Sequence, residues 1–412
     1  MMIVDIAVLL LTTPSRRQCI TLQYHIFQER GSHCMQVAIV GCGFVADYYL
    51  STLPLHSDLQ LKGVMDKIPE RAMNFSEFHS IDVYQTFDEL LSDKDIEIVL
   101  NLTNPRDHYE VSLAALKAGK HVYSEKPLGM NMDEAKELVA LAESKNLQIS
   151  SAPCSLLGET AQTLWQAQRE NTIGKVRVVY AEMDDGLVHL MTYDKWVSLS
   201  GVPWPAKDEF EVGCTLEHAG YYVSWFAAFF GPATSVTAFG STQIENKIPG
   251  VELNMDSPDF TVACIQFASG VVARLTCSII APHNHQLKIV GDKGILFTED
   301  AWDYYAPVYS RKMMHIRRKT FYSPVKRRHK MTMADTPKVK NSGAQRMDFA
   351  RGVAEMAAAI CENRPSRLSA QFSLHVNEIA LAIHYARQQG ATYQMTTTFD
   401  PVEPANWAKG KL

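Results

Sequence analysis

The sequence has no apolar run approaching the roughly 20 residues that a transmembrane helix needs. It also has little excess of either charge, since 40 Lys and Arg stand against 45 Asp and Glu, a formal net charge of -5. That near balance is not typical of a protein that binds nucleic acid through its overall charge. The apolar fraction of 46% is that of an ordinary folded chain. We therefore expect neither a membrane nor a nucleic acid as partner.

Cysteine is sparse and scattered, with 8 residues in the whole chain. None of them forms a C-x-x-C pair or a spacing typical of zinc ligands. Isolated thiols are typical of proteins that stay in a reducing compartment. We therefore predict a cytoplasmic protein without a metal site.

The chain is too long for one ordinary hydrophobic core, so we expect two domains. We predict a dinucleotide-binding domain over residues 35–154 and a substrate-binding and oligomerisation domain over residues 155–412. Residues 1–34 are an extension whose apolar run, Ile6 to Leu11, follows no positive charge and so does not read as a signal peptide. Because Met35 directly precedes the first expected strand, we expect translation to begin there. The alternative is a loosely ordered extension.

The strongest motif of the first domain is a glycine turn between an apolar strand and a helix, Gly41-Cys42-Gly43-Phe44-Val45-Ala46. In such a G-x-G-x-x-A turn, Gly41 permits the tight turn, Gly43 lets the backbone approach a pyrophosphate, and Ala46 lets the helix pack closely. The backbone N–H groups through Phe44 and Val45 would then face the phosphates at the helix N-terminus. The motif alone is common, so its context decides.

The sequence around the glycine turn supplies the context that a dinucleotide-binding motif requires. A second apolar run, Leu59 to Met65, ends in Asp66, about 20 residues after the turn, where an acid that binds ribose hydroxyls is expected. Asp66 favours NAD over NADP, although the neighbouring Lys67 could soften the preference. Strand and helix patterns alternate up to about residue 153, which predicts an α/β Rossmann domain with a parallel sheet.

Polar residues follow two later strands of this predicted sheet. Thr103-Asn104-Pro105 follows one, with Asn104 expected to cap the next helix, and Glu125-Lys126-Pro127 follows the other. Ligands of doubly wound sheets collect at the carboxyl ends of the strands, so these residues should meet the glycine turn along one rim. From the residues alone, Lys126 is as consistent with a solvated surface charge as with a functional group.

The segment TNPRDHYEVSLAALKAGKHVYSEKPLG, residues 103–129, resembles the glucose–fructose oxidoreductase/inositol dehydrogenase/MocA family. The family's strand end reads Thr-Pro-Asn, whereas this chain has Thr103-Asn104-Pro105. His108 stands at the position of a histidine that family members share. The resemblance implies that Lys126 lies near the nicotinamide and the substrate and that the bond before Pro127 is cis. It implies NAD as cofactor, with NADP possible, bound by Gly41, Gly43, Phe44, Val45, Asp66, Thr103, Asn104, His108, Glu125, Lys126 and Pro127.

Beyond residue 155 strand patterns dominate, at 175–183, 233–241, 260–267, 271–280 and 286–290. They predict an α+β domain with a large, mostly antiparallel sheet. In the resembling family this sheet forms the substrate floor and the oligomer interface, which implies a homodimer or homotetramer. Two helices, at 341–363 and 371–389, are expected to close the domain.

A second set of chemical groups lies on an expected helix that begins near Gly213. Residues four apart share a helix face, so His218 and Tyr222 project together, as do Glu217 and Tyr221. Comparison with the family places an acid/base pair at His218 and Tyr222, with Lys126 lowering the tyrosine pKa. The alternative is that the aromatic helix only packs on the sheet.

Two further segments have open interpretations. The aromatic stretch between Asp184 and Gly213 either closes over a polyhydroxylated ligand or forms a subunit contact. The basic run from Arg311 to Lys330 is interpreted as a solvated or oligomer-facing loop, with the diphosphate of a nucleotide-sugar or a nucleic acid as alternative partners.

Together these features predict an NAD(P)-dependent oxidoreductase that moves a hydride between the nicotinamide and a secondary alcohol or ketone of a sugar, cyclitol or nucleotide-sugar. Lys126 would polarise the oxygen, and Tyr222 or His218 would handle the proton. One alternative is a glycoside-cleaving enzyme that oxidises its substrate transiently. Another is a non-catalytic regulator that binds dinucleotide or sugar.

Overall fold

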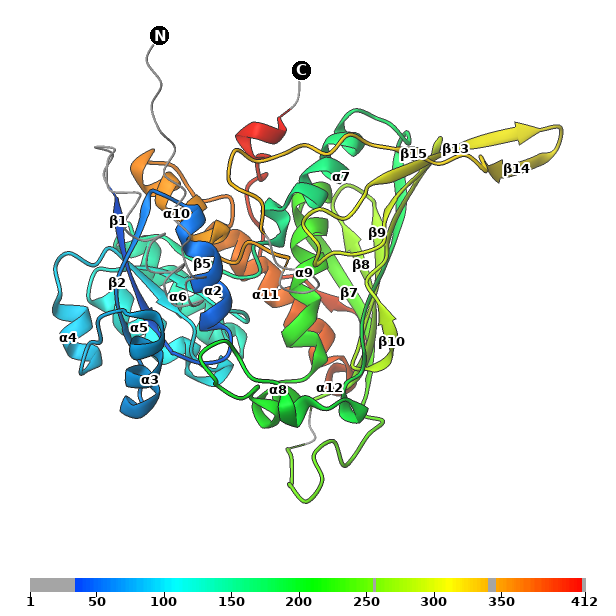
Figure 1. Ribbon diagram of the computed structural model, residues 1–412. Coiled ribbons are helices and arrows are strands. Elements are labelled where there is room, and N and C mark those ends of the chain that lie inside the picture. The colour runs from blue at the N-terminus through cyan, green and yellow to red at the C-terminus, as the bar shows by residue number, and fades with distance from the viewer. Residues whose placement is uncertain (1–33, 255–256, 340–345, 410–412) are drawn as a thin grey trace, which may run out of the picture.

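The computed structural model describes residues 34–254, 257–339 and 346–409. Two β-sheets organise this part of the chain, with long helices between them (Figure 1). The predicted extension, residues 1–34, lies outside the described residues except for Cys34. Among the helices that the structure describes, none has the length and apolarity needed to cross a bilayer.

The first sheet is parallel and has the strand order β2-β1-β3-β4-β5. After β1 the chain moves one way to β2 and then returns to β3 on the other side. The carboxyl ends of β1 and β3 therefore flank the point where a doubly wound sheet binds its ligand. Its strands are β1 (Met35–Val40), β2 (Leu59–Met65), β3 (Ile98–Asn101), β4 (His121–Ser124) and β5 (Ile149–Ser151).

Helices cover this sheet as predicted for a Rossmann domain (Figure 1). Thr86 and Asn131 each accept a hydrogen bond from the backbone N–H three residues on and so cap helices. Asn104 occupies the N-cap position before Pro105, as predicted, but its side chain makes no capping hydrogen bond, because its amide donates to Asp208 instead. The helices are α2 (Ala46–Thr52), α3 (Pro69–His79), α4 (Phe87–Ser92), α5 (His108–Lys117) and α6 (Met132–Ser144).

The second sheet has eleven strands in the main order β14-β13-β12-β11-β6-β9-β8-β7-β16, with β10 paired to β6 and β15 to β13. All its pairs are antiparallel except β6 with β9. The prediction of a large, mostly antiparallel sheet is confirmed. Its strands are β6 (Val176–Leu187), β7 (Ala233–Ser241), β8 (Phe260–Phe267), β9 (Val272–Ser278), β10 (Ile280–Asn284), β11 (Leu287–Gly291), β12 (Gly294–Thr298), β13 (Tyr309–Ile316), β14 (Lys319–Tyr322), β15 (Arg327–Arg328) and β16 (Tyr393–Gln394).

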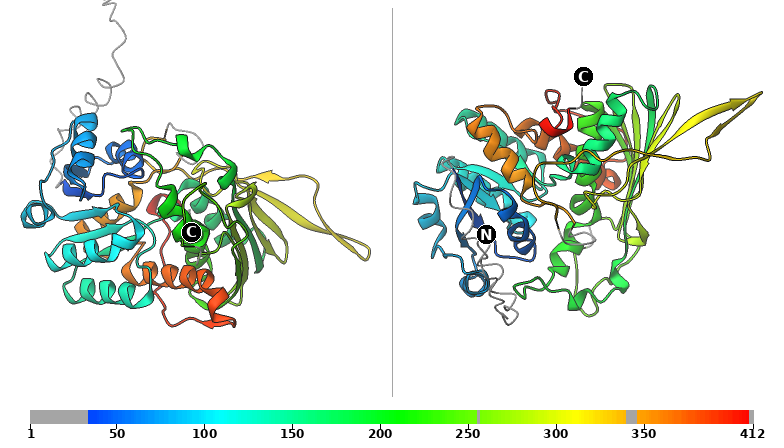
Figure 2. Two further views of the ribbon diagram at one scale, coloured as in Figure 1. Left: turned by 90° about the horizontal axis from the view of Figure 1, so that it is seen from below. Right: turned by 45° about the horizontal axis from the view of Figure 1, so that its top comes forward.

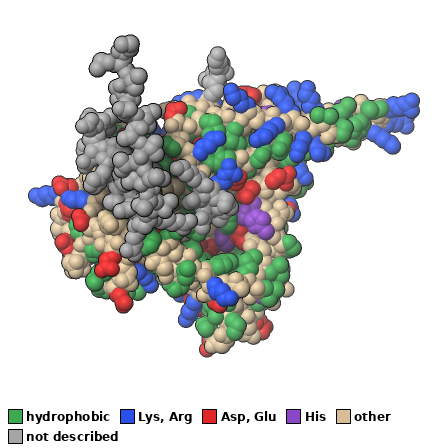
Figure 3. Space-filling model, in the orientation of Figure 1, with side chains coloured by type: hydrophobic (Ala, Val, Ile, Leu, Met, Phe, Trp, Pro, Cys, Tyr) green, Lys and Arg blue, Asp and Glu red, His purple; other side chains and the backbone are tan. Residues whose placement is uncertain are grey.

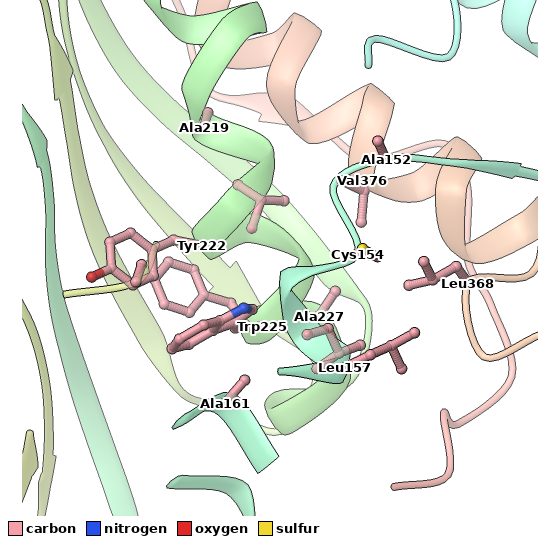
Figure 4. Close-up of a cluster of buried hydrophobic side chains, with 14 of the residues drawn as sticks. Ala152, Cys154, Leu157, Ala161, Ala219, Tyr222, Trp225, Ala227, Leu368 and Val376 are labelled. Atoms are coloured by element: carbon pink, nitrogen blue, oxygen red, sulfur yellow. The ribbon is translucent and has the colours of Figure 1, made fainter. Parts of the chain in front are cut away.

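The remaining helices pack between the sheets, with α9 and α11 side by side (Figure 1). Aromatic side chains of α9 fill the core against the second sheet (Figure 4). The helix expected from residue 341 begins only at Arg351, and residues 340–345 lie outside the described part. These helices are α7 (Glu159–Arg169), α8 (Ala206–Val212), α9 (Cys214–Phe230), α10 (Arg351–Cys361), α11 (Ala370–His384) and α12 (Ala386–Gln389). Since α11 contacts α6 of the first half as well as β7 of the second, the domain boundary at residue 154 stays a prediction.

The basic run from Arg311 to Lys330 forms a hairpin rather than a loop. Strands β13 and β14 pair and project away from the body of the protein (Figures 1 and 2). Lys and Arg side chains gather at its far end (Figure 3). None of its residues lines the cavity described below, so a nucleotide-sugar diphosphate held there would lie outside that cavity.

Candidate active site

A cavity of about 670 Å³ lies between the two sheets, at the carboxyl ends of the parallel strands. The first domain contributes residues of the glycine turn and of two strand ends. These are Gly43, Phe44, Val45, Thr103, Asn104, His108, Glu125 and Lys126. The second half contributes residues of β6, α8, α9 and the loops around them. Among these are Asp185, Trp196, Trp204, Glu209, Glu217, His218, Tyr221, His283 and Trp302.

The glycine turn has the backbone that a dinucleotide requires. Gly41 has φ +99°, and a Cβ there would lie 2.6 Å from the carbonyl oxygen of Leu102, so only glycine fits. A Cβ on Gly43 would meet nothing within 4 Å, because this residue faces the open cavity. The turn therefore leaves room for a pyrophosphate against its backbone, as the sequence predicts.

Asp66 directly follows β2 beside this turn, as predicted, although it does not line the cavity itself. Its carboxylate accepts hydrogen bonds from the backbone N–H groups of Cys42 and Ile68, both at 2.8 Å. The guanidinium of Arg71 lies 3.7 Å away. A carboxylate at this position suits the ribose hydroxyls of NAD, whereas a nearby arginine suits the 2′-phosphate of NADP.

Buried hydrogen bonds hold the two strand ends together. Asn101, at the end of β3, accepts from the N–H and hydroxyl of Thr103 and donates to the His108 carbonyl. The His108 ring lies 2.8 Å from the carbonyl oxygen of Pro127 and 2.9 Å from that of Thr103. The Lys126–Pro127 bond is cis, as the resemblance implies. His108 thus joins the two loops that carry the predicted cofactor residues.

Lys126 projects from the end of β4 into the cavity and pairs with Glu217 of α9. Burial favours the neutral amine, but the charges of Glu217, Glu209 and Glu125 outweigh that effect and raise the pKa of Lys126. Burial together with the charge of Glu217 raises the pKa of the Glu209 carboxyl well above its ordinary value. Lys126 is therefore held as a cation in the cavity.

Tyr222 is not where the sequence analysis expected an acid/base. Its side chain is fully buried, stacks on Phe226 at a centroid distance of 5.9 Å, and donates to the backbone carbonyl of His285. Figure 4 shows the ring beside Trp225 among buried apolar side chains. Burial raises the pKa of Tyr222 well above its ordinary value. It does not line the cavity, so the geometry does not support its expected contact with the reacting oxygen.

Tyr221, one position earlier, does line the cavity together with Glu217. The two are four residues apart on α9 and so share a face, while Tyr222 lies on the face that packs against the sheet. The sequence analysis recognised this pair as co-facial but chose the neighbouring pair. Burial raises the pKa of Tyr221, although the positive charge of Lys126 opposes that shift.

His218 lines the cavity as predicted, and its Nδ1 lies 2.8 Å from an oxygen of Asp185 on β6. Asp185 was not among the residues predicted for the site. Burial alone would raise the pKa of its carboxyl, but His218 and His285 outweigh this and lower it. The signal available was strand alternation, which places Asp185 on the same face as the buried Ala181 and Met183.

The aromatic stretch after β6 forms one wall of the cavity. Trp196 and Trp204 line it and contact each other in a T-shaped pair at a centroid distance of 5.1 Å. Ser200 ties the stretch to the first domain, because its N–H and hydroxyl donate to Asp47 of α2. The stretch therefore lies beside the cavity, where the interpretation as a ligand-covering segment expects it.

Known proteins resemble the chain in sequence and in fold. It is 28% identical over 293 residues to trans-1,2-dihydrobenzene-1,2-diol dehydrogenase of Mus musculus, covering 70% of this chain and 80% of the relative. It is 30% identical over 225 residues to an uncharacterized oxidoreductase of Schizosaccharomyces pombe, covering 53% of this chain and 57% of that protein.

Two solved structures share the fold. Aldose-aldose oxidoreductase from Caulobacter crescentus superposes with a TM-score of 0.69 at 18% identity, covering 88% of this chain and all of that one (100%). The WlbA dehydrogenase from Bordetella pertussis, in complex with NADH and UDP-GlcNAcA, superposes with a TM-score of 0.68 at 15% identity, covering 90% and 99%.

Two family profiles match the chain itself. Residues 35–152 match the oxidoreductase family with an NAD-binding Rossmann fold, and residues 161–297 match the GFO/IDH/MocA C-terminal domain. The first matched region contains the parallel sheet, and the second contains most of the antiparallel sheet. The chain therefore belongs to the GFO/IDH/MocA family of oxidoreductases.

Proposed function

We propose that this oxidoreductase transfers a hydride between NAD(H), or NADP(H), and a secondary alcohol or ketone of a sugar, cyclitol or nucleotide-sugar. One observation carries the proposal. Lys126, Glu217 and Tyr221 converge on the cavity that begins at the glycine turn. A cation, a carboxylate and a phenol at one place are what proton transfer to or from a carbinol oxygen requires.

The nicotinamide supplies the hydride acceptor or donor when the dinucleotide lies along Gly43 and the strand ends. The side chains supply the rest. Lys126, held by Glu217, directs its positive charge at the substrate oxygen and stabilises alkoxide character there. Tyr221 lies within the same cavity and exchanges the proton with that oxygen, with the charge of Lys126 favouring phenolate.

His218 is the second candidate for the proton. Its Nδ1 lies against the ionised Asp185, which leaves Nε2 for the cavity. A carboxylate in that position orients the ring. We propose that Tyr221 contacts the substrate oxygen and that His218 relays the proton toward solvent.

The substrate class follows from the wall of the cavity and from the relatives. Trp196, Trp204 and Phe349 offer aromatic faces, while Asn104 and Asp208 offer polar groups. This mixture suits a ring with apolar C–H faces and several hydroxyls. The mouse relative is named for a cyclic vicinal diol, and the two solved structures are named for sugars and a nucleotide-sugar. We therefore propose a cyclic substrate with adjacent hydroxyls.

We also propose a cytoplasmic protein that forms a homodimer or homotetramer. The cysteines that the structure describes are all free thiols, which suits a reducing compartment. Several large apolar side chains are exposed on the second sheet and its hairpin, among them Tyr180, Phe239 and Phe321. Such exposure supports a contact between subunits.

The test begins with a fluorescence titration of the folded full chain with NADH and, separately, NADPH. A panel of sugars, cyclitols, nucleotide-sugars and cyclic vicinal diols is then screened for formation of reduced nicotinamide. Saturable dinucleotide binding and turnover of one class are expected. Binding of neither dinucleotide by folded, cofactor-free protein would overturn the proposal. Binding without turnover would favour a regulator, and release of a sugar without net reduction would favour transient oxidation.

A further inference from the structure

Beside the proposed proton groups lies a cluster of two imidazoles and a carboxylate that hydride transfer does not require. Asp185 lies two residues before the end of β6, and His283 and His285 come from β10 and the residue just after it. One ligating atom of each of these three side chains lies within 4.8 Å of the other two. On the face drawn in Figure 3, histidine side chains gather in one place beside acidic ones.

The fold explains why these residues meet. His283 and His285 are two apart, and alternate residues of an extended chain point to the same side. β10 pairs with β6, but the register shifts between Ala281 and Asn284. Such an irregularity redirects the following side chains. As a result the two rings lie 4.1 Å apart, centroid to centroid, beside Asp185.

We propose that Asp185, His283 and His285 bind one divalent transition-metal ion, of which Zn²⁺ is the best fit, in the wall of the cavity. Two imidazoles and one carboxylate make a ligand set that first-row transition metals prefer to Mg²⁺ or Ca²⁺. Three protein ligands also leave at least one coordination position open, as in catalytic rather than structural zinc sites.

The distances are close to those of a metal site. Nε2 of His285 lies 2.7 Å from Oδ1 of Asp185, a hydrogen-bond separation. Neighbouring ligands on a tetrahedral ion with bonds of about 2.0 Å are about 3.3 Å apart. Spreading the two atoms by roughly half an ångström lets the ion take the place of the shared proton. His283 is exposed and lines the cavity, so it can complete the site by a side-chain rotation.

A second observation points to a ligand at this place. Oδ2 of Asp185 and Nδ1 of His218 are buried and 2.8 Å apart, and neither has another polar partner among the described residues. The carboxylate oxygen and the imidazole nitrogen thus each have room for one further polar group.

The surroundings also resemble the outer shell of a metal site. Tyr222 donates to the carbonyl of His285 and fixes its backbone, and Trp302 covers the ring at a centroid distance of 4.4 Å. Asp300 lies on the far nitrogen of His285, where a carboxylate would orient the ring. This arrangement gives the buried Tyr222 a structural role next to the site.

The open position faces the cavity, because Asp185 and His283 both line it. This step alone rests on the proposed function: a substrate with adjacent hydroxyls would place one oxygen on the metal and the other near Lys126. The metal would then hold the non-reacting oxygen and set which carbon faces the nicotinamide. Metal binding itself rests only on the three side chains.

Metal binding is measured on the full chain, first freed of metal with chelator and then dialysed against ZnCl₂ or CoCl₂, without dinucleotide or substrate. We expect one equivalent of Zn²⁺ per chain and a visible Co²⁺ absorption spectrum. His283→Ala should weaken Zn²⁺ binding by more than about 100-fold, the upper end of what loss of an outer-shell partner costs. His315→Ala, which changes an exposed histidine on the projecting hairpin, should leave it unchanged.

A wild-type chain that binds less than half an equivalent at micromolar Zn²⁺ would overturn the proposal. So would equal Zn²⁺ affinities for His283→Ala and His315→Ala. Thermal unfolding of each variant verifies that it is folded, and His283 is exposed, so its loss should not disturb the core. Because the assay contains no dinucleotide, its outcome is independent of whether the chain is a dehydrogenase.

Discussion

The ammonium group of Lys126 pairs with the carboxylate of Glu217, which comes 91 residues later in the chain. Lys126 follows a strand of the Rossmann sheet, and Glu217 lies in the first turn of the helix that packs on the antiparallel sheet. This ion pair therefore spans the two halves at the cavity. A buried cation that keeps its charge is what the proposed chemistry needs at the substrate oxygen.

Lys126→Met removes that charge from the cavity. We expect kcat to fall by about 10²–10⁴-fold, because the substrate oxygen loses the group that stabilises its developing charge. NADH affinity should change little. Steady-state kinetics and fluorescence titration measure the two quantities, with Lys117→Met, an exposed lysine on α5, as the control. Full turnover by Lys126→Met with a true substrate would contradict the proposed role.

Tyr221 and Tyr222 are adjacent, so their phenylalanine variants form a matched pair. Tyr221→Phe removes a hydroxyl in the cavity and should lower kcat by about 10²–10⁴-fold with unchanged stability. Tyr222→Phe removes a buried hydrogen bond to the carbonyl of His285 and should cost about 1–2 kcal/mol of unfolding free energy with nearly normal kcat. Denaturant unfolding measures the stability of both variants, and steady-state kinetics measures their kcat. The reverse pattern would restore the interpretation from sequence.

Local patterns in the sequence were sufficient for the Rossmann half. The glycine turn could be predicted because its function depends on local backbone geometry. Gly41 has a positive φ and closely approaches Leu102, which only glycine allows. The strands predicted at 233–241 and 260–267 were also found at those bounds, since alternation between a buried and an exposed face is visible residue by residue.

The active-site helix shows what the sequence could not decide. Tyr221 and Tyr222 are the same residue type at neighbouring positions of one helix. Only the orientation of α9 against the sheet decides that Tyr221 lines the cavity and that Tyr222 is buried in the core. Asp185 was missed for a similar reason, since its partners His218 and His285 come from other elements. The His-x-His pair at His283 and His285 is visible in the sequence, but only the fold brings it beside Asp185.

The cofactor preference depends on Asp66. Asp66→Ala removes the expected ribose ligand, and we predict that NADH binds about tenfold more weakly, the cost of one hydrogen bond to a charged group, while NADPH binding improves relative to it. Arg71, 3.7 Å from Asp66, is then free to meet a 2′-phosphate. Fluorescence titration of both nucleotides measures the ratio, with the exposed Asp58→Ala as control. An unchanged ratio of NADH to NADPH affinity would show that Asp66 does not determine the cofactor preference.

Two glutamates on α8 have pKa values shifted in opposite directions. Burial and the neighbouring Glu217 raise the pKa of Glu209 well above its ordinary value. For Glu211, burial alone would raise the pKa, but the backbone N–H of Asn254 and the guanidinium of Arg106 outweigh it and lower the pKa. The two residues lie on the same short helix, so their glutamine variants control for each other.

The pH dependence of stability should separate these two glutamates. With its folded-state pKa raised, Glu209 favours the native state below the unfolded-state pKa, about 4.3, and costs stability as pH rises through that value toward its folded pKa. Glu209→Gln should therefore match the wild type near pH 4 and exceed it in unfolding free energy near pH 8. Glu211→Gln should show the opposite pattern, less stable than the wild type at pH 8 and equal to it at low pH. Urea unfolding at both pH values measures this, and a Glu209→Gln variant that is destabilised at pH 8 would show that Glu209 is ionised in the native state and that Lys126 is held by both carboxylates.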